Sequence, residues 1–335
     1  MDFGDFGVTH SLMTREDGAG SVELVGEGVE WTRGGASPST VLLASTEVPG
    51  WVLGTLPESD LGWRCEEGGW ASRVVRGPVH DLISVSRSEV GGLSAEAFQR
   101  VATSAYERVA ERVATQRCHP VRLWNFIPGI LEPLGDLPHR YMVFNAGRLE
   151  GFKHWLQQTD EGLWRSLATA TGVGSPGDTL VVHCLAAEHP GIPVENPRQC
   201  PAYRYSQRYG PKPPCFARAT RIEATPSGQP WLLVGGTASV LGEDTAHGDD
   251  LGLQIDETFA NLAALVEAGG TNGERPPCDP FARFRHLRVY HPRAEDAELI
   301  RRRIAESFPR LEACEMQQAT LCRPDLRVEI EGLVE

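Results

Sequence analysis

Residues 319–334 of this chain read ATLCRPDLRVEIEGLV. Apolar and charged side chains alternate along the second half of the stretch, which predicts a β-strand with one apolar and one charged face. The apolar positions are Leu326, Val328, Ile330 and Leu333, and the charged positions are Arg327, Glu329 and Glu331. A Pro324-Asp325 turn separates this strand from Cys322, so a thiol and two carboxylates are held close together. Taken alone, the pattern is typical of a terminal strand whose charged face meets water.

Composition places the chain among ordinary globular proteins. It has 335 residues, of which 41% are hydrophobic and 23% are charged, enough for two domains with cores of their own. No apolar run is long enough to cross a bilayer, and the acidic start lacks the basic and apolar regions of a signal peptide, so we expect a cytoplasmic protein. The eight cysteines contain no C-x-x-C pair and are expected to be reduced thiols.

The formal net charge is −13. A charge of this sign argues against nucleic acid or an anionic membrane as a partner. It also means that an anionic substrate would need arginines concentrated around its binding site.

The first half of the chain alternates predicted strands and helices. Short extended segments are expected at residues 39–45 and 51–56. Ser94 is the expected N-cap of a helix whose apolar positions recur at helical spacing as far as Val113. Further along, we expect a strand at 121–127, a helix at 141–156 and a strand at 179–186.

Residues 190–214 differ in composition from the rest of the chain. Seven prolines fall within these 25 residues, so neither a helix nor a central strand fits there. The segment also carries three tyrosines and three arginines, and flexible linkers rarely contain so many aromatic residues. This composition favours a stiff loop that wraps an active site.

The second half repeats the order of the first. Its expected elements are a strand at 231–234 that runs into Gly235-Gly236, a helix at 255–266 closed by Gly269-Gly270, a strand at 284–291, a helix at 299–308 and the final strand. Two successive units of this kind predict an α+β fold with two tandem domains, 1–195 and 196–335. Each domain would be a mixed sheet covered on one face by two helices, and the other faces of the two sheets would be free to pack together.

Several kinds of site find no support in the sequence. The ten histidines are scattered, with no H-E-x-x-H and no cysteine pair at ligand spacing, so no metal is expected. Neither a G-x-G-x-x-G nor a G-x-x-x-x-G-K loop is present, which argues against a nucleotide cofactor, and no G-x-S-x-G marks a hydrolase serine. We therefore expect no cofactor.

Two arginines stand in apolar or small-residue surroundings. Arg148 lies inside a predicted helix and Arg218 on a predicted strand of the other half. Singly, each is more often part of a structural ion pair. Together, and close to Tyr203, Tyr205 and Tyr209 of the proline-rich loop, they would make a receptor for a dicarboxylate, because a guanidinium can grip a carboxylate through two hydrogen bonds. From the residues alone, the prediction is a pocket for a small anion with a carboxyl acid.

Five ordered motifs carry a resemblance that covers the chain from about residue 90 to its end. They are RLWNFIPG at 122–129, YMVFNAGR at 141–148, CFARA at 215–219, GGTAS at 235–239, and CRPDL at 322–326 followed by VEIE at 328–331. Together they resemble the chorismatase family. Residues 255–268 and the VEIE strand also resemble imine deaminases of the RidA/YjgF type, whose small fold chorismatases contain twice. The resemblance implies that the free sheet faces are buried between the domains, which would place Glu329 inside the protein.

The resemblance further implies a reaction and its residues. Chorismatases release pyruvate from chorismate, which carries two carboxylates. By resemblance, Glu329 is the general acid toward the enol ether, for which its pKa must be raised by burial. Arg148 and Arg218, with one or more of Tyr203, Tyr205 and Tyr209, would orient chorismate.

The family has an aromatising branch that forms 3-hydroxybenzoate and a hydrolytic branch that forms a dihydroxycyclohexadiene carboxylate. The aromatising enzymes resemble this chain in a glycine and a cysteine that face the ring, here Gly235 and Cys322. Chorismate equals 3-hydroxybenzoate plus pyruvate without added water, so the ring hydroxyl would displace the enolpyruvate through an arene-oxide-like intermediate. The thiol would move protons, and the missing Cβ of Gly235 would leave room for the ring.

Three alternatives remain open at this stage. The first is the hydrolytic branch, and the second is an imine deaminase, although the arginine that the RidA proteins carry after a Phe-Pro pair has no clear counterpart near Phe308-Pro309. The third is a ligand-binding protein without activity. The sequence does not distinguish a monomer from a homotrimer.

Overall fold

The computed structural model describes residues 46–335 except 58–61, 157–163, 224, 226–227, 249 and 271–278. It also describes the backbone of three short strands near the N-terminus, which are β1 (Thr14–Glu16), β2 (Val22–Leu24) and β3 (Val29–Glu30). The strand expected at 39–45 lies outside the described residues.

Six strands form the first sheet, in the spatial order β4-β5-β6-β9-β7-β8. Their bounds are Arg64–Cys65 (β4), Trp70–Arg76 (β5), His80–Arg87 (β6), His119–Pro128 (β7), Thr169–Ser175 (β8) and Leu180–Ala187 (β9). Two long helices accompany this sheet, α2 (Ala95–Gln116) and α3 (Arg140–Leu156). The Ser94 side chain accepts a hydrogen bond from the backbone N–H of Ala97, so the predicted N-cap of α2 is confirmed.

Seven strands form the second sheet, in the order β10-β11-β12-β17-β15-β16-β3. The new members are Ile192–Val194 (β10), Ala219–Ile222 (β11), Trp231–Ala238 (β12), Phe284–His291 (β15), Ala313–Gln318 (β16) and Glu329–Val334 (β17). Its helices are α5 (Leu251–Ala268), which Gly269 caps as predicted, and α6 (Ala297–Ser307). A small hairpin, β13 (Val240–Leu241) and β14 (Asp244–Thr245), follows β12.

Short 3-10 turns complete the described elements. They are η2 (Glu67–Gly69), η3 (Trp164–Ser166), η4 (Ala202–Arg204), η5 (Gln207–Tyr209), η6 (Pro280–Arg283) and η7 (Ala294–Asp296).

The two sheets share one topology. Five strands of each half, numbered by their order in the chain, pair in the spatial order 1-2-5-3-4: β5-β6-β9-β7-β8 in the first half and β11-β12-β17-β15-β16 in the second. In both halves the third and fourth strands run parallel and the other pairs run antiparallel. The predicted repeat and the predicted α+β class are therefore confirmed.

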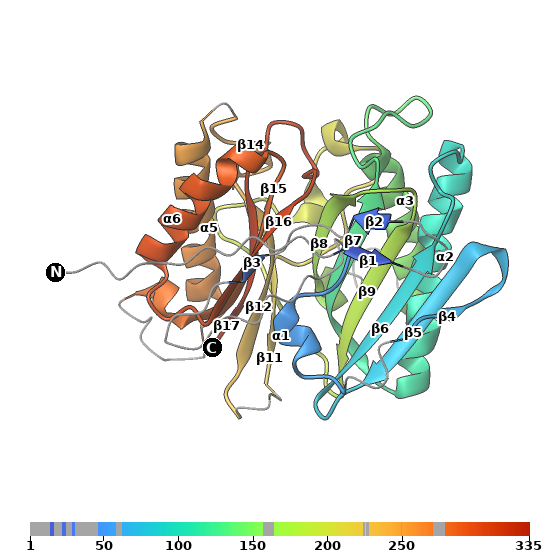
Figure 1. The fold of residues 1–335 in the computed structure, drawn as a ribbon, viewed down its shortest axis with the longest axis horizontal. Coiled ribbons are helices and arrows are strands. Elements are labelled where there is room, and N and C mark those ends of the chain that lie inside the picture. The colour runs from blue at the N-terminus through green and yellow to red at the C-terminus, as the bar shows by residue number, and fades with distance from the viewer. Residues whose placement is uncertain are drawn as a thin grey trace.

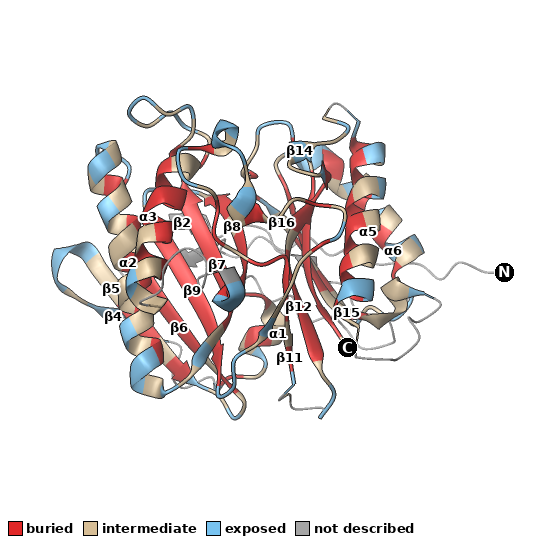
Figure 2. Ribbon diagram, turned by 180° about the vertical axis from the view of Figure 1, so that it is seen from behind, coloured by how far each residue is buried: buried red, intermediate tan, exposed pale blue. Residues whose placement is uncertain are grey.

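The molecule is built from four layers. Figure 1 shows α5 and α6 on one outer side, α2 and α3 on the other, and the two sheets between them. One apolar core lies between the first sheet and α2 and α3, another between the second sheet and α5 and α6, and a third between the two sheets. As a result, the central strands are buried and the helices expose their outer faces, as Figure 2 shows. The prediction that the free sheet faces are buried against each other is confirmed.

Two strands that lie before the expected domain boundary pair with the second sheet. β10 ends at Val194 and already pairs with β11 of the second sheet, and β3 near the N-terminus pairs with β16 of that sheet. The boundary between residues 195 and 196 stays a prediction. Within the described residues, no helix is both long and apolar enough to span a membrane.

Two local predictions were wrong. Residues 51–56 do not form a strand, because α1 (Gly50–Leu53) and a turn occupy them. A short apolar run does not distinguish a strand from a helix, and here packing decides, since Trp51 meets Trp231 of the other half edge to face with ring centroids 6.0 Å apart. In the last strand, Leu333 shares the face of the two glutamates, whereas Val328 and Ile330 face the helices; the alternation continues through Gly332, so residue 333 falls on the glutamate side.

Candidate active site

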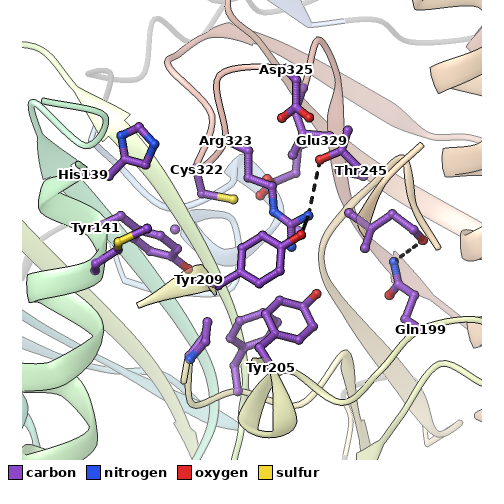
Figure 3. Close-up of a pocket in the computed structure, with 18 of the residues that line it drawn as sticks. His139, Tyr141, Gln199, Tyr205, Tyr209, Thr245, Cys322, Arg323, Asp325 and Glu329 are labelled. Atoms are coloured by element: carbon purple, nitrogen blue, oxygen red, sulfur yellow. Dashed lines mark hydrogen bonds between the residues drawn. The ribbon is translucent and has the colours of Figure 1, made fainter. Parts of the chain in front are cut away.

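A pocket of about 680 Å³ lies where the two halves meet. The first half supplies its wall from the start of α3 and from β8, through residues such as Tyr141, Arg148 and Gly172. The second half supplies β12, the loop that begins at Cys322, and Glu329 at the start of β17. Figure 3 shows Tyr141 of the first half and Cys322 and Glu329 of the second converging on one cavity.

The proline-rich segment covers part of this pocket, as its composition predicted. Tyr205 and Tyr209 line the cavity, and their rings lie 5.2 Å apart between centroids. Tyr203 does not line it and instead packs against the core beneath α2 and α3, so Tyr205 and Tyr209 are the two of the three candidate tyrosines that face the cavity. The loop is tied to the β13–β14 hairpin by Glu243, which accepts hydrogen bonds from the backbone N–H and the hydroxyl of Ser206, both at 2.8 Å.

Arg148 and Arg218 both line the pocket and are deeply buried, with 1% and 7% of their surface exposed. Arg148 donates to the side-chain oxygen of Asn145 at 2.8 Å, and Arg218 donates to the Tyr205 hydroxyl at 2.6 Å and to the carbonyl of Cys200 at 3.0 Å. Among the described residues, neither forms an ion pair with a carboxylate, and the Nε of each is buried without a hydrogen-bond partner. The carboxyl of Glu195 acts on Arg218 from a longer distance. Two buried guanidinium groups that no carboxylate pairs with directly are strong receptors for an anion.

Glu329 lies on the same cavity, with only 4% of its surface exposed. Burial, followed by repulsion from Glu331, raises the pKa of its carboxyl to about 8, although Arg122, Arg218 and Arg323 act in the opposite direction. Among the described residues, no arginine or lysine forms an ion pair with it. At neutral pH it is therefore a protonated acid that faces a pocket with positive walls.

Glu331, two residues further along the same strand face, has a different environment. It forms an ion pair with Arg122 at 2.7 Å and accepts a hydrogen bond from the indole of Trp124 at 2.8 Å, both on β7 of the first sheet. The hydroxyl of Thr171 on β8 also donates to it. Of the two glutamates on this strand face, Glu331 is therefore held by a cation and Glu329 is not.

Cys322 lines the pocket beside Glu329. Burial, followed by the nearby Glu329, raises the pKa of its thiol to about 12, so the group is an uncharged thiol at neutral pH. In Figure 3 its sulfur points into the space that Tyr141, Tyr209 and Glu329 surround. Because the thiol carries its proton, it can act first as a proton donor, and only the thiolate that remains can accept a proton.

The glycine that faces the acid is Gly236, not Gly235. The register of β12 against β17 shifts between Val234 and Thr237, which makes a β-bulge of the two glycines. A Cβ on Gly236 would lie 2.0 Å from Oε1 of Glu329, whereas a Cβ on Gly235 would lie 2.4 Å from the Thr169 hydroxyl, against the other sheet. Gly236 lines the pocket and Gly235 does not, so the predicted role of Gly235 is corrected.

Three further pocket residues were missed as candidates. Tyr141 is the first residue of the YMVFNAGR motif, and Arg323 follows Cys322, so both stood inside quoted motifs. Arg323 donates to the carbonyl of Glu243 at 2.9 Å, and its guanidinium lies 4.2 Å from the Tyr209 ring centroid. The third is His139, whose Nδ1 lies 3.0 Å from the carbonyl oxygen of Leu131 and which no motif singled out.

Within the described part of the chain, no group of three or more His, Cys, Asp or Glu side chains is arranged to hold a metal ion.

Comparisons with known proteins agree with this geometry. The family described as "Chorismatase FkbO/Hyg5-like, N-terminal" matches residues 80–186. The chain is 36% identical over 219 residues to a 3-hydroxybenzoate synthase of Streptomyces hygroscopicus, an alignment that covers 64% of this chain and 62% of that protein. It is 32% identical over 256 residues to a chorismatase of Streptomyces rapamycinicus, covering 76% of this chain and 74% of that protein.

A solved structure shows the same fold. A crystal structure of a chorismatase superposes with a TM-score of 0.67 at 28% sequence identity, and the alignment covers 82% of this chain and 80% of that one. Sequence identity over most of a relative's length, this shared architecture and the pocket between the halves lead to one conclusion: the chain belongs to the chorismatase family.

Proposed function

We propose that this protein converts chorismate to 3-hydroxybenzoate and pyruvate. The observation that carries the proposal is a buried, protonated Glu329 in a pocket that also holds two guanidinium groups without a carboxylate partner and an uncharged thiol. The relative that covers 64% of this chain is itself a 3-hydroxybenzoate synthase.

Binding follows from the charges. Chorismate has one carboxylate on its ring and another on its enolpyruvyl group, and Arg148 and Arg218 are the natural receptors for the pair. Each charge-assisted hydrogen bond contributes about 1.5–3 kcal/mol where water is excluded. Tyr205 holds Arg218 in place through its hydroxyl, and Arg323 adds positive charge on the side of Tyr209.

The first chemical step uses Glu329 as the acid. Its proton moves to the methylene carbon of the enolpyruvyl group, and the C–O bond between this group and the ring breaks as pyruvate leaves. The ring hydroxyl oxygen forms a bond to the carbon that pyruvate leaves, which closes an epoxide. The Glu329 carboxylate takes the hydroxyl proton, so the acid is restored.

The second step makes the ring aromatic. The epoxide opens as its bond to the carbon that first carried the hydroxyl breaks and its oxygen receives a proton. The oxygen stays on the carbon that pyruvate left, and this carbon loses its hydrogen. Cys322 is placed to carry out both transfers, because an uncharged thiol can first give its proton to the oxygen and then, as a thiolate, take the ring hydrogen. No water is consumed, and both residues return to their starting protonation states.

An assay of the products tests the proposal. Purified protein is incubated with chorismate in ¹⁸O-water, and pyruvate and ring products are resolved by mass. We expect 3-hydroxybenzoate without label and an equal amount of pyruvate. Label in the ring product or a non-aromatic diol would favour the hydrolytic branch. Ammonia release from an imino acid, with no turnover of chorismate, would favour an imine deaminase.

The raised pKa of Glu329 predicts how activity depends on pH. The reaction needs this carboxyl in its protonated form, so kcat/KM should be level below pH 8 and fall above it, by about tenfold per pH unit. The measurement is kcat/KM for chorismate from pH 6 to pH 10. A profile that rises through this range would assign Glu329 the role of a base.

Replacing Cys322 by alanine should affect chemistry more than binding. We expect 3-hydroxybenzoate formation to fall by about 10²-fold, the lower end of the usual effect of a proton-transfer group, while KM for chorismate changes little. Cys118, which lies outside the pocket, provides the matched control through Cys118→Ala. An unchanged rate and product profile in Cys322→Ala would exclude the thiol from the reaction.

The bulge glycines give a paired prediction. Gly236→Ala would place a methyl group against the Glu329 carboxyl, so we expect kcat/KM to fall by about 10²-fold, as when a catalytic group is misplaced by about 1 Å, with the fold retained. Gly235→Ala would press instead on Thr169 and on the backbone of Ala170, so we expect a lower melting temperature. Activity and thermal unfolding of both variants decide the matter. A loss of activity in Gly235→Ala, with a lower melting temperature in Gly236→Ala, would show that Gly235 is the glycine that leaves room for the substrate ring.

A further inference from the structure

We propose that Glu331 is a positioning residue for Glu329. Residues of the first half of the molecule hold the Glu331 carboxylate, and its fixed negative charge lies beside the acid. Glu329 therefore keeps its proton until it transfers this proton to the substrate. This inference rests on the proposed function, because it gives a reason why one of two neighbouring carboxyl groups is an acid.

Three donors surround the carboxylate of Glu331. Only 3% of its surface is exposed, yet a guanidinium, an indole N–H and a hydroxyl all point at its carboxylate. Arg122 and Trp124 stand two residues apart on β7, so their side chains lie on one face of the first sheet. A cation and two neutral donors therefore hold this buried carboxylate in place.

Glu329 and Glu331 are neighbours on one face of the same strand. They are two residues apart on β17, on the face that meets the first sheet, where little water is present to screen them. A shared contact ties their positions together: Thr171 donates to Glu331, and its oxygen accepts the backbone N–H of Gly236 at 3.0 Å. Gly236 is the residue whose open face receives Glu329.

The remaining groups around Glu329 decide where the proton resides. Arg218 and Arg323 approach it from the pocket and Arg122 from β7, while Cys322, Tyr141 and Tyr290 are uncharged neighbours. None of these cations forms an ion pair with Glu329, whereas Arg122 is within 2.7 Å of Glu331. Two neighbouring buried carboxyl groups do not both ionise readily, so the one with the cation takes the charge and the other keeps the proton.

One consequence concerns the role of the first half. The acid and the thiol both belong to the second half, but the three donors that hold Glu331 belong to β7 and β8. The first sheet therefore sets the protonation state of an acid that it does not carry.

A titration of Glu329 tests this directly and does not need turnover. In protein labelled with ¹³C at the glutamate carboxyl carbons, the resonance that disappears in Glu329→Gln belongs to Glu329. We expect its midpoint near pH 8 in the natural protein and about one pH unit lower in Glu331→Gln, where the neighbouring charge is gone. The upper limb of kcat/KM for chorismate should move by the same amount, a loss of about fivefold at pH 8.

Glu47→Gln is the matched control. It removes a carboxylate that also bridges to a buried arginine, Arg73 at 2.5 Å, but Glu47 is not among the groups that shift the pKa of Glu329 most. In Glu47→Gln, the carboxyl of Glu329 should titrate with the same midpoint as in the natural protein. An unchanged midpoint in folded Glu331→Gln would overturn the proposal.

Glu331→Gln leaves Arg122 buried without its partner and could fail to fold. In that case the double variant Arg122→Met/Glu331→Gln, which replaces the ion pair by two neutral side chains, takes its place. A midpoint below that of the natural protein supports the proposal, because Glu331 acts on Glu329 more strongly than Arg122 does. A midpoint equal or higher overturns it. Absence of any chorismate turnover would reject the proposed function but would leave the titration result intact.

Discussion

Glu329→Gln lowers kcat for chorismate by about 10³-fold, within the usual contribution of a general acid, while KM changes by less than about threefold. The asymmetry has a physical reason. Near neutral pH the Glu329 carboxyl is protonated, so glutamine preserves its shape and its lack of charge and removes only the proton that is transferred. Steady-state kinetics at pH 7 provide the measurement.

Glu329→Gln should leave the stability of the fold unchanged. Because glutamine replaces a neutral group, the melting temperature of Glu329→Gln should match that of the natural protein. Glu312→Gln, at an exposed surface carboxylate, should leave both kinetics and melting unchanged. If Glu329→Gln retained more than about a tenth of the natural kcat, the loss would be below that of a proton-transfer group, and the acid would have to be another residue.

Arg218→Met should lower kcat/KM for chorismate by about 10³-fold, because truncating one partner of a buried charge pair costs about 2–5 kcal/mol. Most of the loss should appear in KM, since the guanidinium binds a carboxylate that does not react. Arg218→Lys keeps the positive charge but loses the pair of parallel hydrogen bonds that a guanidinium can make to a carboxylate. Its kcat/KM should lie between the values for the natural protein and for Arg218→Met. Tyr205→Phe removes the hydroxyl that orients Arg218 and should have a smaller effect of the same kind.

Arg198→Met is the matched control for this series. Arg198 lies in the same proline-rich segment, but it pairs with Glu257 at 2.5 Å and does not line the pocket. Its removal should lower stability without raising KM. Equal KM values for Arg218→Met and the natural protein would show that the substrate carboxylates bind elsewhere.

The repeated fold was predictable because local signals and global topology agree. The cap at Ser94, the glycine after α5 and the regular apolar spacing of the helices all survive in the structure. The strand predicted at residues 51–56 was wrong because the local signal there is ambiguous. Their apolar pattern fits two structures equally well, and a contact between Trp51 and Trp231, 180 positions away, decides between them.

The fate of the charged strand face could not be derived from the strand itself. Alternation shows that Glu329 and Glu331 share a face, but not what covers that face. The partner is the first sheet, and the residues that receive Glu331 lie about two hundred positions earlier in the chain. Only the resemblance to a family placed these carboxylates inside the protein.

What the sequence left wrong or open within the site has one cause, which is that sequence does not show where a backbone changes direction. A bulge turns Gly235 and Gly236 to different neighbours, and a motif cannot tell which of two adjacent glycines faces the acid. In the proline-rich loop, two short 3-10 turns direct Tyr205 and Tyr209 to the pocket and Tyr203 to the core.

The central claim is that the ring hydroxyl of chorismate, not water, displaces the enolpyruvyl group. Chorismate labelled with ¹⁸O in that hydroxyl tests it most directly, because the label also exposes a route in which a diol forms first and then loses water. We predict 3-hydroxybenzoate that retains the label in its phenolic oxygen, together with unlabelled pyruvate. Unlabelled 3-hydroxybenzoate would contradict the account, because the hydroxyl oxygen would then have been lost and the oxygen of the product would have come from the ether or from solvent.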